Sequence, residues 1–240
     1  MTRLVLLRHG QSAWNIQKRF TGWVDVDLTA VGVEQARQAG ALVKAEGLLF
    51  ERAFVSVLTR AIRTACLALA AADQLWIPVI KDWRLNERHY GGLTGLEHGP
   101  TEAIHGVEQV RIWRRSYDVA PPPLSPGSAH DFSKDRRYAK ITPPASESLK
   151  TTLQRVLPYW NAEIAPRAAA GETLLIAAHG NSLRAIMKHL FNISDADITG
   201  LEIPTGNPLL LELSATLSPT AARYLDPAAA APLPGLPGPG

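Results

Sequence analysis

Near the start of the chain, residues 4–10 read Leu-Val-Leu-Leu-Arg-His-Gly, and this stretch decides the fold. A continuous apolar run without alternating polar residues is typical of a strand buried on both faces of a parallel sheet. The strand is predicted to end at Arg8-His9-Gly10, which places a cation and an imidazole at its carboxyl end. Because open parallel sheets bind ligands at that edge, His9 is the first candidate for a functional residue.

A second strand end repeats the pattern. Residues 173–178, Thr-Leu-Leu-Ile-Ala-Ala, predict another buried strand, and His179-Gly180 follows it. Adjacent strands lie about 4.8 Å apart, so His9 and His179 could share one site. A single histidine at a strand end is more often structural, but two such ends in one chain reverse that expectation. We expect each following glycine to let the backbone approach a ligand. Ser182 is predicted to cap the next helix, whose free amides favour phosphate.

Strands and helices are predicted to alternate along the rest of the chain. Apolar residues at helical spacing follow Thr29, and Thr59 is predicted to cap an alanine-rich helix over 60–72. Ser148 opens a helix interrupted by prolines. Further strands are expected over 54–57, over 76–80 as an edge strand containing Pro78, and over 209–213. This order predicts an α/β fold with a mainly parallel central sheet and helices on both faces.

One catalytic domain is expected over residues 1–226. Between about 91 and 145 the sequence is rich in Gly, Pro and charge, with one plausible helix over 101–117, and we interpret it as an insertion over the active face. Residues 227–240 contain only Pro, Ala, Gly and Leu. That tail is predicted to be disordered because nothing in it holds a helix or a strand.

The composition argues against a membrane protein, a secreted protein and a nucleic-acid-binding protein. With 46% hydrophobic and 20% charged residues, the chain has the balance of a globular protein without a membrane span or a signal peptide, so we expect a cytoplasmic location. The formal net charge of +3 is too small to predict a nucleic-acid partner. The single cysteine, Cys66, cannot form an internal disulfide and is expected to be a buried structural thiol.

The residues near the two histidines fit phosphoryl transfer. Arg8 and Arg60 stand at strand-to-helix junctions, where their guanidinium forks could hold a transferring phosphoryl group. Such cations also keep an imidazole deprotonated and nucleophilic. Glu87 follows the third predicted strand and is the candidate proton donor and acceptor, although it could instead be a surface carboxylate paired with Arg84 or Arg88. The remaining histidines lack metal-ligand spacing, so no metal is predicted.

Several segments together resemble the cofactor-dependent phosphoglycerate mutases of the histidine phosphatase superfamily. The resemblance spans almost the whole chain before the tail, whereas Arg-His-Gly alone would mark only the superfamily. It implies the phosphoglycerate mutase-like α/β fold. The matching segments are residues 6–15, 19–23, 56–61, 85–91, 113–115, 178–184 and 203–206.

The resemblance also implies a role for each matching position. His9 would be the residue that is phosphorylated, Glu87 the proton donor and acceptor, and His179 a group that stabilises the transition state. Arg8 and Arg60 would hold the phosphoryl group. Further implied substrate contacts are Asn15, Thr21, Gly22, Tyr90, Arg114, Arg115, Gly180 and Asn181. We expect Gln11, Ser12 and His98 to bind substrate as well.

The implied reaction is the interconversion of 3-phosphoglycerate and 2-phosphoglycerate in glycolysis and gluconeogenesis. In this reading 2,3-bisphosphoglycerate primes His9 and remains bound as the intermediate, with no metal. The partner is a small phosphorylated substrate. The family is commonly oligomeric, so we expect a homo-oligomer, a dimer or a tetramer, in which the apolar segment 76–80 could pair across an axis.

Three departures from the family pattern leave an alternative open. Gln11 stands where most relatives carry glutamate, and His98 stands where mutases usually carry a lysine. The lysine-containing C-terminal segment of the family's members is replaced here by the neutral tail, 227–240. Weaker closure would favour a histidine-type phosphatase acting on a small phosphorylated metabolite. A binding protein without activity is the third hypothesis, but it would not need the five implied catalytic residues, all of which are present.

Overall fold

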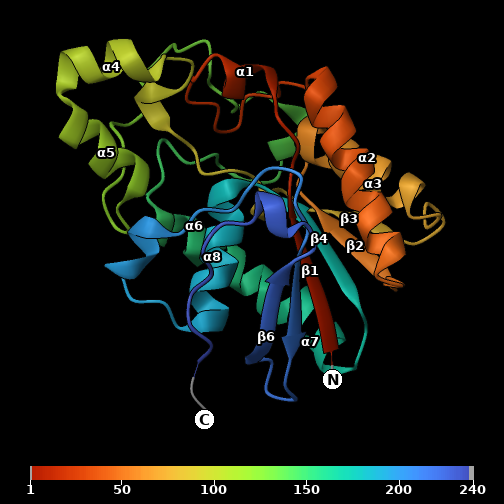
Figure 1. Ribbon diagram of the computed structural model, residues 1–240. Helices are drawn as coiled ribbons and strands as arrows, with labels where there is room; N and C mark the ends of the chain where they lie inside the picture. The colour runs from red at the N-terminus through yellow and green to blue at the C-terminus, as the bar shows by residue number, and fades with distance from the viewer. Residues whose placement is uncertain (1, 238–240) are drawn as a thin grey trace.

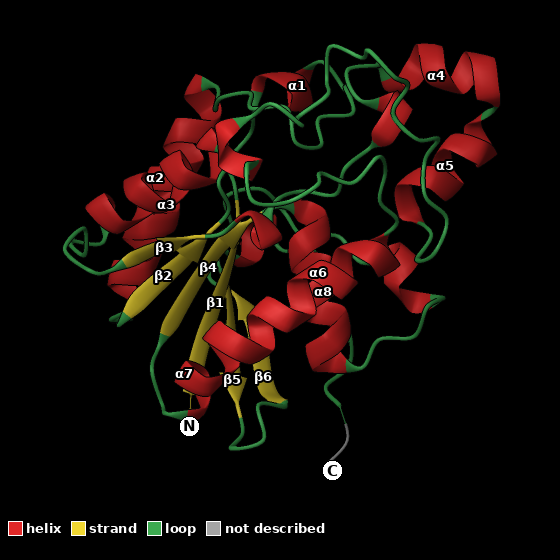
Figure 2. Ribbon diagram, turned by 180° about the vertical axis from the view of Figure 1, so that it is seen from behind, coloured by secondary structure: helices red, strands yellow, loops and turns green. Residues whose placement is uncertain are grey.

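A computed structural model describes residues 2–237, and its centre is one mixed sheet (Figure 2). The strand order is β3-β2-β4-β1-β5-β6. The first four of these strands run parallel, whereas β5 is antiparallel to β1 and β6 to β5, which confirms the mainly parallel sheet. The strands are β1 (Thr2–Arg8), β2 (Arg52–Val55), β3 (Val79–Lys81), β4 (Leu174–Ala178), β5 (Leu209–Leu213) and β6 (Pro219–Tyr224).

Helices cover both faces of the sheet, which explains the continuous apolar run in β1. Val5 and Leu7 belong to the core cluster formed with α2 (Ala30–Ala45) and α3 (Thr59–Ala71). Leu4 and Leu6 belong to the cluster on the opposite face. There α6 (Leu149–Tyr159), α7 (Ala165–Ala169) and α8 (Gly180–Phe191) supply the partners (Figure 1). The apolar side chains on both faces of β1 are therefore buried, as is typical of parallel sheets covered by helices on both sides.

Two glycines allow close packing on the α2 side. A Cβ at Gly10 would lie 2.3 Å from the carbonyl oxygen of Gly32 in α2, and a Cβ at Gly40 would lie 2.1 Å from that of Ala68 in α3. Our expectation that Gly10 serves the approach of a ligand was therefore incomplete. Gly10 is required because the loop after β1 touches the backbone of a helix.

Ser148, predicted to open its helix, is the N-cap of α6, but the caps predicted at Thr59 and Ser182 were wrong. Leu58 is the N-cap of α3, and Thr59 lies inside the helix with its hydroxyl donating to Asp25. His179 is the N-cap of α8, because its backbone is still extended and the helix begins at Gly180. Ser182 contributes from the third helical position, where its Oγ accepts the N–H of His179 at 3.2 Å.

Other elements differ from their predicted bounds. The single helix expected over 101–117 is α4 (His98–His105) followed by α5 (Val107–Arg115), because Gly106 breaks it with a φ of 84°. The helix after Ser148 continues from α6 into α7 through a π-helical turn, Trp160–Ile164. The short α1 (Ala13–Ile16), the strand β6 and several 3-10 turns were not predicted. Those turns are Trp83–Leu85, Gly91–Leu93, Arg136–Tyr138, Asp197–Gly200 and Pro227–Ala229.

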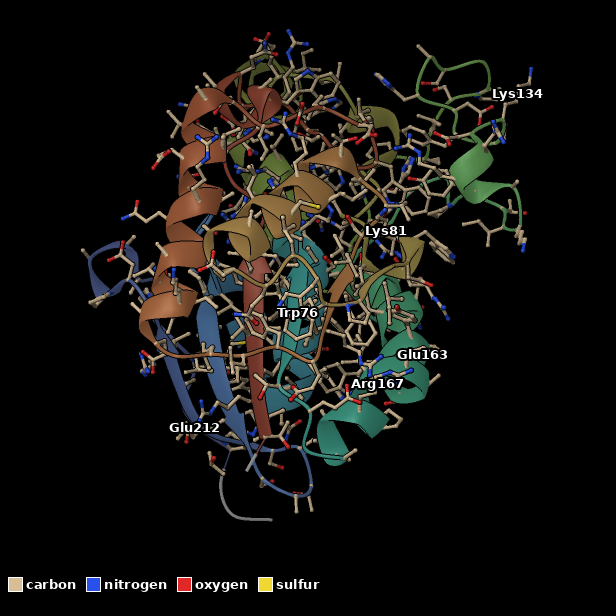
Figure 3. All side chains as sticks on the ribbon, turned by 90° about the vertical axis from the view of Figure 1, so that its right-hand side faces the viewer. Trp76, Lys81, Lys134, Glu163, Arg167 and Glu212 are labelled. Carbon is tan, nitrogen blue, oxygen red and sulfur yellow. The ribbon has the colours of Figure 1, made fainter. Side chains whose placement is uncertain are left out.

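The predicted edge strand and the predicted buried thiol also need correction. β3 is at the sheet edge as expected, but it covers only 79–81. Trp76 precedes it and is 77% exposed (Figure 3). Cys66 is exposed on α3 because its neighbours Ala65, Ala68 and Leu69 form the buried stripe of that helix.

Both ends of the described chain lie away from the carboxyl ends of the parallel strands (Figure 1). Within the tail, Ala231 and Leu233 pack against the core cluster that contains α8. Disorder over 227–240 stays a prediction, and its last part, 238–240, lies outside the described residues. Across the described chain, no helix combines the length and the apolar character that a membrane crossing needs.

The α2–α3 contact gives a stability prediction. Replacing Gly40 by alanine should lower the free energy of unfolding by about 1–3 kcal/mol, because the new methyl group must displace helix backbone. Chemical denaturation measures the change. Gly200→Ala is the matched control, since its Cβ would meet nothing within 4 Å. Equal stabilities for Gly40→Ala and the wild type would contradict the close packing.

Candidate active site

The pairing of β1 with β4 brings the two histidines together. Arg8 lies opposite Ala178 in the parallel register, and the His9 N–H donates to the Ala178 carbonyl oxygen at 3.0 Å. The ring centroids of His9 and His179 are 4.9 Å apart with an interplanar angle of 59°. His9 is 3% exposed and His179 is fully buried. The two strand ends therefore contribute to one site, as predicted from their sequences.

His9 is held as a neutral imidazole with one nitrogen free. Its Nδ1 lies 2.7 Å from the Gly10 carbonyl oxygen. A carbonyl can only accept, so Nδ1 carries the proton and Nε2 keeps its lone pair. Burial, and next the charges of Arg60 and Arg8, hold the pKa of His9 well below its usual value of 6.5. His9 Nε2 is consequently a nucleophile at neutral pH.

Backbone carbonyls hold the two arginines beside His9. Arg60 is 1% exposed and donates from Nη1 to Val24 at 2.9 Å and from Nη2 to Gly22 at 2.8 Å. Burial lowers the pKa of Arg60 to about 10, so it stays charged at neutral pH. Arg8 donates from Nη1 to Ile203 at 2.7 Å, and its buried Nε has no partner among the described residues. These guanidinium groups keep donors for a bound anion.

Glu87 is anchored through its own backbone. Its carbonyl oxygen accepts hydrogen bonds from Trp23 Nε1 at 2.6 Å and from Arg155 Nη2 at 2.9 Å. On the side chain, Oε1 accepts the N–H groups of Arg88 at 2.7 Å and Asn181 at 3.1 Å. These bonds fix one carboxylate oxygen and leave Oε2 to face the site.

Glu87 is not the surface carboxylate of the alternative interpretation. It is 8% exposed. Arg84 pairs with Asp82 at 2.8 Å instead, and Arg88 donates to the carbonyl of Arg114. Glu87 Oε2 and the Arg8 guanidinium both flank Gly180, since a Cβ on Gly180 would lie 3.6 Å from the one and 3.5 Å from the other.

Two adjoining cavities contain most of the predicted site residues. The larger has a volume of about 670 Å³ and the smaller about 100 Å³, and both are lined by Arg8, Glu87, Tyr90 and Arg114. His179 and Ser12 line neither cavity, because both are fully buried, and Ser12 caps α1. The larger cavity also has His9, Gln11, Asn15, Thr21, Gly22, Arg60 and His98, and the smaller has Arg115, Gly180 and Asn181.

The smaller cavity contains a second cationic group of side chains. Arg115 forms an ion pair with Glu202 across it. Asn181 Oδ1 accepts a hydrogen bond from the buried Arg184 at 2.9 Å, so the Asn181 amide nitrogen points to the Tyr90 hydroxyl at 3.3 Å. Sequence analysis missed the role of Arg184 because that role is to orient another side chain.

Two of the departures from the family pattern lie on the larger cavity. The Gln11 Oε1 accepts a hydrogen bond from the Thr29 hydroxyl at 3.0 Å, which a carboxylate could also accept. His98 is half-buried, and burial, followed by Arg114 and Lys18, lowers its pKa to about 4. His98 is therefore neutral at physiological pH, whereas a lysine at this position would be charged.

Ser56 is a further site residue that the sequence analysis did not assign. Its Oγ lies 2.7 Å from His179 Nε2 and accepts the Leu58 N–H at 3.3 Å. After Oγ accepts the Leu58 N–H, its hydroxyl proton remains available to Nε2, and donation of that proton would put the His179 proton on Nδ1. That Nδ1 is buried without a partner among the described residues. The signal was available, since Ser56 directly follows β2 at the same sheet edge.

The described residues contain no group of three or more His, Cys, Asp or Glu side chains placed to hold a metal ion. The positive charges that face the cavities come from arginine and lysine, beside the carboxylates of Glu87, Glu102 and Glu202. This arrangement, with a nucleophilic imidazole between arginines, is suited to holding a phosphoryl group.

Comparison with known proteins agrees with this geometry. The model of the histidine phosphatase superfamily (branch 1) matches residues 4–137 and 128–216. The chain belongs to this superfamily. It is 66% identical to the 2,3-bisphosphoglycerate-dependent phosphoglycerate mutase of Caulobacter sp. (strain K31), over 98% of this chain and 100% of that one. The enzyme of the same name from Hyphomonas neptunium is 60% identical, over 99% and 100%.

Solved structures of the superfamily share the fold at lower identity. A mycobacterial glucosyl-3-phosphoglycerate phosphatase superposes with a TM-score of 0.70 at 24% identity, covering 93% of this chain and 97% of that one. Bacillus stearothermophilus YhfR superposes with a TM-score of 0.69 at 22% identity, covering 91% and 94%.

The lowered pKa of His9 predicts a pH effect. Below about pH 6.5 the unfolded chain protonates this ring while the folded chain does not, so the free energy of unfolding should fall as the pH drops through that range. Nitrogen NMR of the ring, together with denaturation at several pH values, measures both effects. Arg8→Gln should raise the pKa of His9 and reduce the fall. Protonation of the wild-type ring near 6.5 would contradict the neutral state.

Ser56 gives a second prediction for the site. Ser56→Ala should lower kcat roughly tenfold through loss of one orienting hydrogen bond. The nitrogen NMR signals of His179 should show a changed tautomer, which a purely structural loss would not produce. Ser56→Cys, a weaker donor of similar size, should recover part of the rate. An unchanged tautomer in Ser56→Ala would remove the positioning role.

Proposed function

We propose that this protein interconverts 3-phosphoglycerate and 2-phosphoglycerate through a phosphohistidine at His9. The observation that carries the proposal is the free Nε2 of a neutral His9 between the charged Arg8 and Arg60. The names of the similar Caulobacter and Hyphomonas enzymes support the same reaction. Arg114 lines the same cavity and would bind the other acidic group of the substrate.

The residues divide the chemistry as follows. His9 Nε2 attacks phosphorus, so a nitrogen–phosphorus bond forms while the bond from phosphorus to the substrate oxygen breaks. Arg8 and Arg60 neutralise the charge on the three phosphoryl oxygens, the task that Mg²⁺ performs in kinases. Glu87 Oε2 gives its proton to the leaving oxygen. In the reverse transfer the substrate hydroxyl attacks the phosphohistidine and returns the proton to Glu87.

We further propose that 2,3-bisphosphoglycerate serves as the cofactor. The site fits such a ligand, because Arg8 and Arg60 line the larger cavity beside His9 and Arg114 lines it as well. The unpartnered Arg8 Nε supplies a donor for one phosphate. When bound, this cofactor supplies the phosphoryl group that primes His9. Arg114 and Tyr90 would hold its other acidic groups.

A histidine-type phosphatase is the second candidate. The observation in its favour is the position of the tail, since residues 227–237 contribute none of the side chains that line either cavity. Water that reaches a phosphohistidine releases inorganic phosphate, so an uncovered site favours hydrolysis.

One assay separates the two activities. The protein is incubated with 3-phosphoglycerate, with and without 2,3-bisphosphoglycerate, and 2-phosphoglycerate and inorganic phosphate are followed together. We expect 2-phosphoglycerate to dominate and its formation to need the bisphosphate. Phosphate release as the main reaction would overturn the mutase proposal in favour of the phosphatase.

His9→Ala should abolish both reactions and the acid-labile phosphate that bisphosphoglycerate leaves on the wild type. Acid-lability of the label is characteristic of phosphohistidine and is measured with labelled donor. Glu87→Gln should still acquire the label, but more slowly, and should lose at least about a hundredfold in turnover, because general acid–base catalysis contributes on that scale. Equal labelling of His9→Ala would exclude His9 as the nucleophile.

A homo-oligomer and a cytoplasmic location remain part of the proposal. The edge strand β3 and the exposed Trp76 beside it are available for pairing between subunits. Gel filtration with light scattering would give the number of subunits.

A further inference from the structure

The larger cavity is lined by more basic residues than the proposed reaction has used. Lys18, Arg19 and Arg114 line it together with the neutral His98. Arg19 is already engaged, because it pairs with Glu97 at 2.6 Å and donates to the Gly95 carbonyl at 2.9 Å. Lys18 has no carboxylate partner within ion-pairing distance among the described residues.

The backbone places Lys18 on the cavity by specific contacts. Its N–H donates to the Asn15 carbonyl at 3.2 Å, just after the turn that Ser12 caps. Its own carbonyl accepts the N–H of His98 at 2.9 Å. Lys18 adopts a φ of 50°, a left-handed conformation that lysine rarely takes. The two backbone hydrogen bonds hold Lys18 in this unfavourable conformation, and its long cationic side chain lines the cavity.

The charge requirement of a bisphosphorylated ligand matches this position. Two phosphates repel each other and need separate cations, and Arg8 and Arg60 serve the phosphate next to His9. Glu102, four residues after His98 in α4, also lines this cavity, where its carboxylate repels a second phosphate. Since His98 is uncharged and Arg19 is paired, Arg114 alone would have to neutralise the negative charges of the second phosphate and of Glu102. A lysine ammonium on a flexible stem acts as a compact point charge that can reach such a phosphate.

We infer that Lys18 is a specificity-determining residue that binds the second phosphate of a bisphosphorylated ligand. It favours 2,3-bisphosphoglycerate over anions with one phosphate. This inference rests on the proposed function, because it concerns the same cavity. It assigns to Lys18 the fixed charge that His98 does not supply.

The test removes the charge and preserves the backbone. Lys18→Asn is suited to this because asparagine tolerates the left-handed conformation. Calorimetry with 2,3-bisphosphoglycerate should show roughly tenfold weaker binding, as expected for one charge-assisted contact. Binding of inorganic phosphate should change less than about twofold, because that ligand occupies the His9 end. Lys81→Asn, at an exposed lysine on β3, is the control and should leave both affinities unchanged.

A second variant excludes a general loss of folding. Adding His98→Lys to Lys18→Asn places a permanent cation on the same rim and should recover most of the lost affinity for the bisphosphate. Equal bisphosphate affinities for Lys18→Asn and the wild type would overturn the inference. A parallel loss of phosphate binding, or no recovery in the double variant, would also overturn it.

The outcomes distinguish this inference from the proposed function. If the wild type binds bisphosphoglycerate and forms 2-phosphoglycerate but Lys18→Asn binds equally well, only the role of Lys18 is wrong. If the wild type neither binds the bisphosphate nor needs it for turnover, the proposed cofactor and the role of Lys18 are both wrong.

Discussion

The register between β1 and β4 is the constraint on which the site depends. The hydrogen bond from His9 to Ala178 continues the parallel ladder one residue past the end of β1. Because that ladder aligns Arg8 with Ala178, the next residue of each chain segment is a histidine at the same level. A slip of one residue would turn one imidazole to the opposite face of the sheet. The apolar residues that fix the register are thus also what holds the nucleophile against its partner.

The basic residues of the site are held mainly by backbone oxygens. Arg60 donates to Val24 and Gly22, Arg8 donates to Ile203, and Arg184 donates to Ile198. A carbonyl oxygen fixes the orientation of a guanidinium group and leaves its charge intact, whereas a carboxylate would neutralise it. The site therefore keeps its positive potential for an incoming anion.

Sequence reasoning found the parts of the site that depend on strand ends. The apolar runs predict where β1 and β4 end, and the two His-Gly pairs then fall at one edge. It did not assign Ser56, Arg184 or Lys18. Ser56 and Lys18 contact residues far away in the sequence, although the place of Ser56 after β2 was a usable signal. Arg184 was missed because it orients Asn181 within the same helix and was not itself expected to touch substrate. Whether Lys18 lies beside His98 depends on how the loop after α1 meets the start of α4.

The errors in the fold have similar local causes. Thr59 and Ser182 are good capping residues, but the backbone enters each helix earlier than their side chains suggest. The break at Gly106 depends on a positive φ that a helical pattern does not show. Cys66 lies in an apolar stretch, yet only one face of α3 packs on the sheet, so the thiol is on the other face.

The close contact of Gly10 with Gly32 changes what the tripeptide Arg-His-Gly means. Two of its letters serve phosphoryl chemistry, but the third is required by a helix that begins twenty positions later. A descendant of this protein that had lost its activity would still need glycine at this position, because the packing against the helix leaves no room for a side chain. The glycine is therefore evidence of the fold, and only the histidine and the arginine are evidence of catalysis.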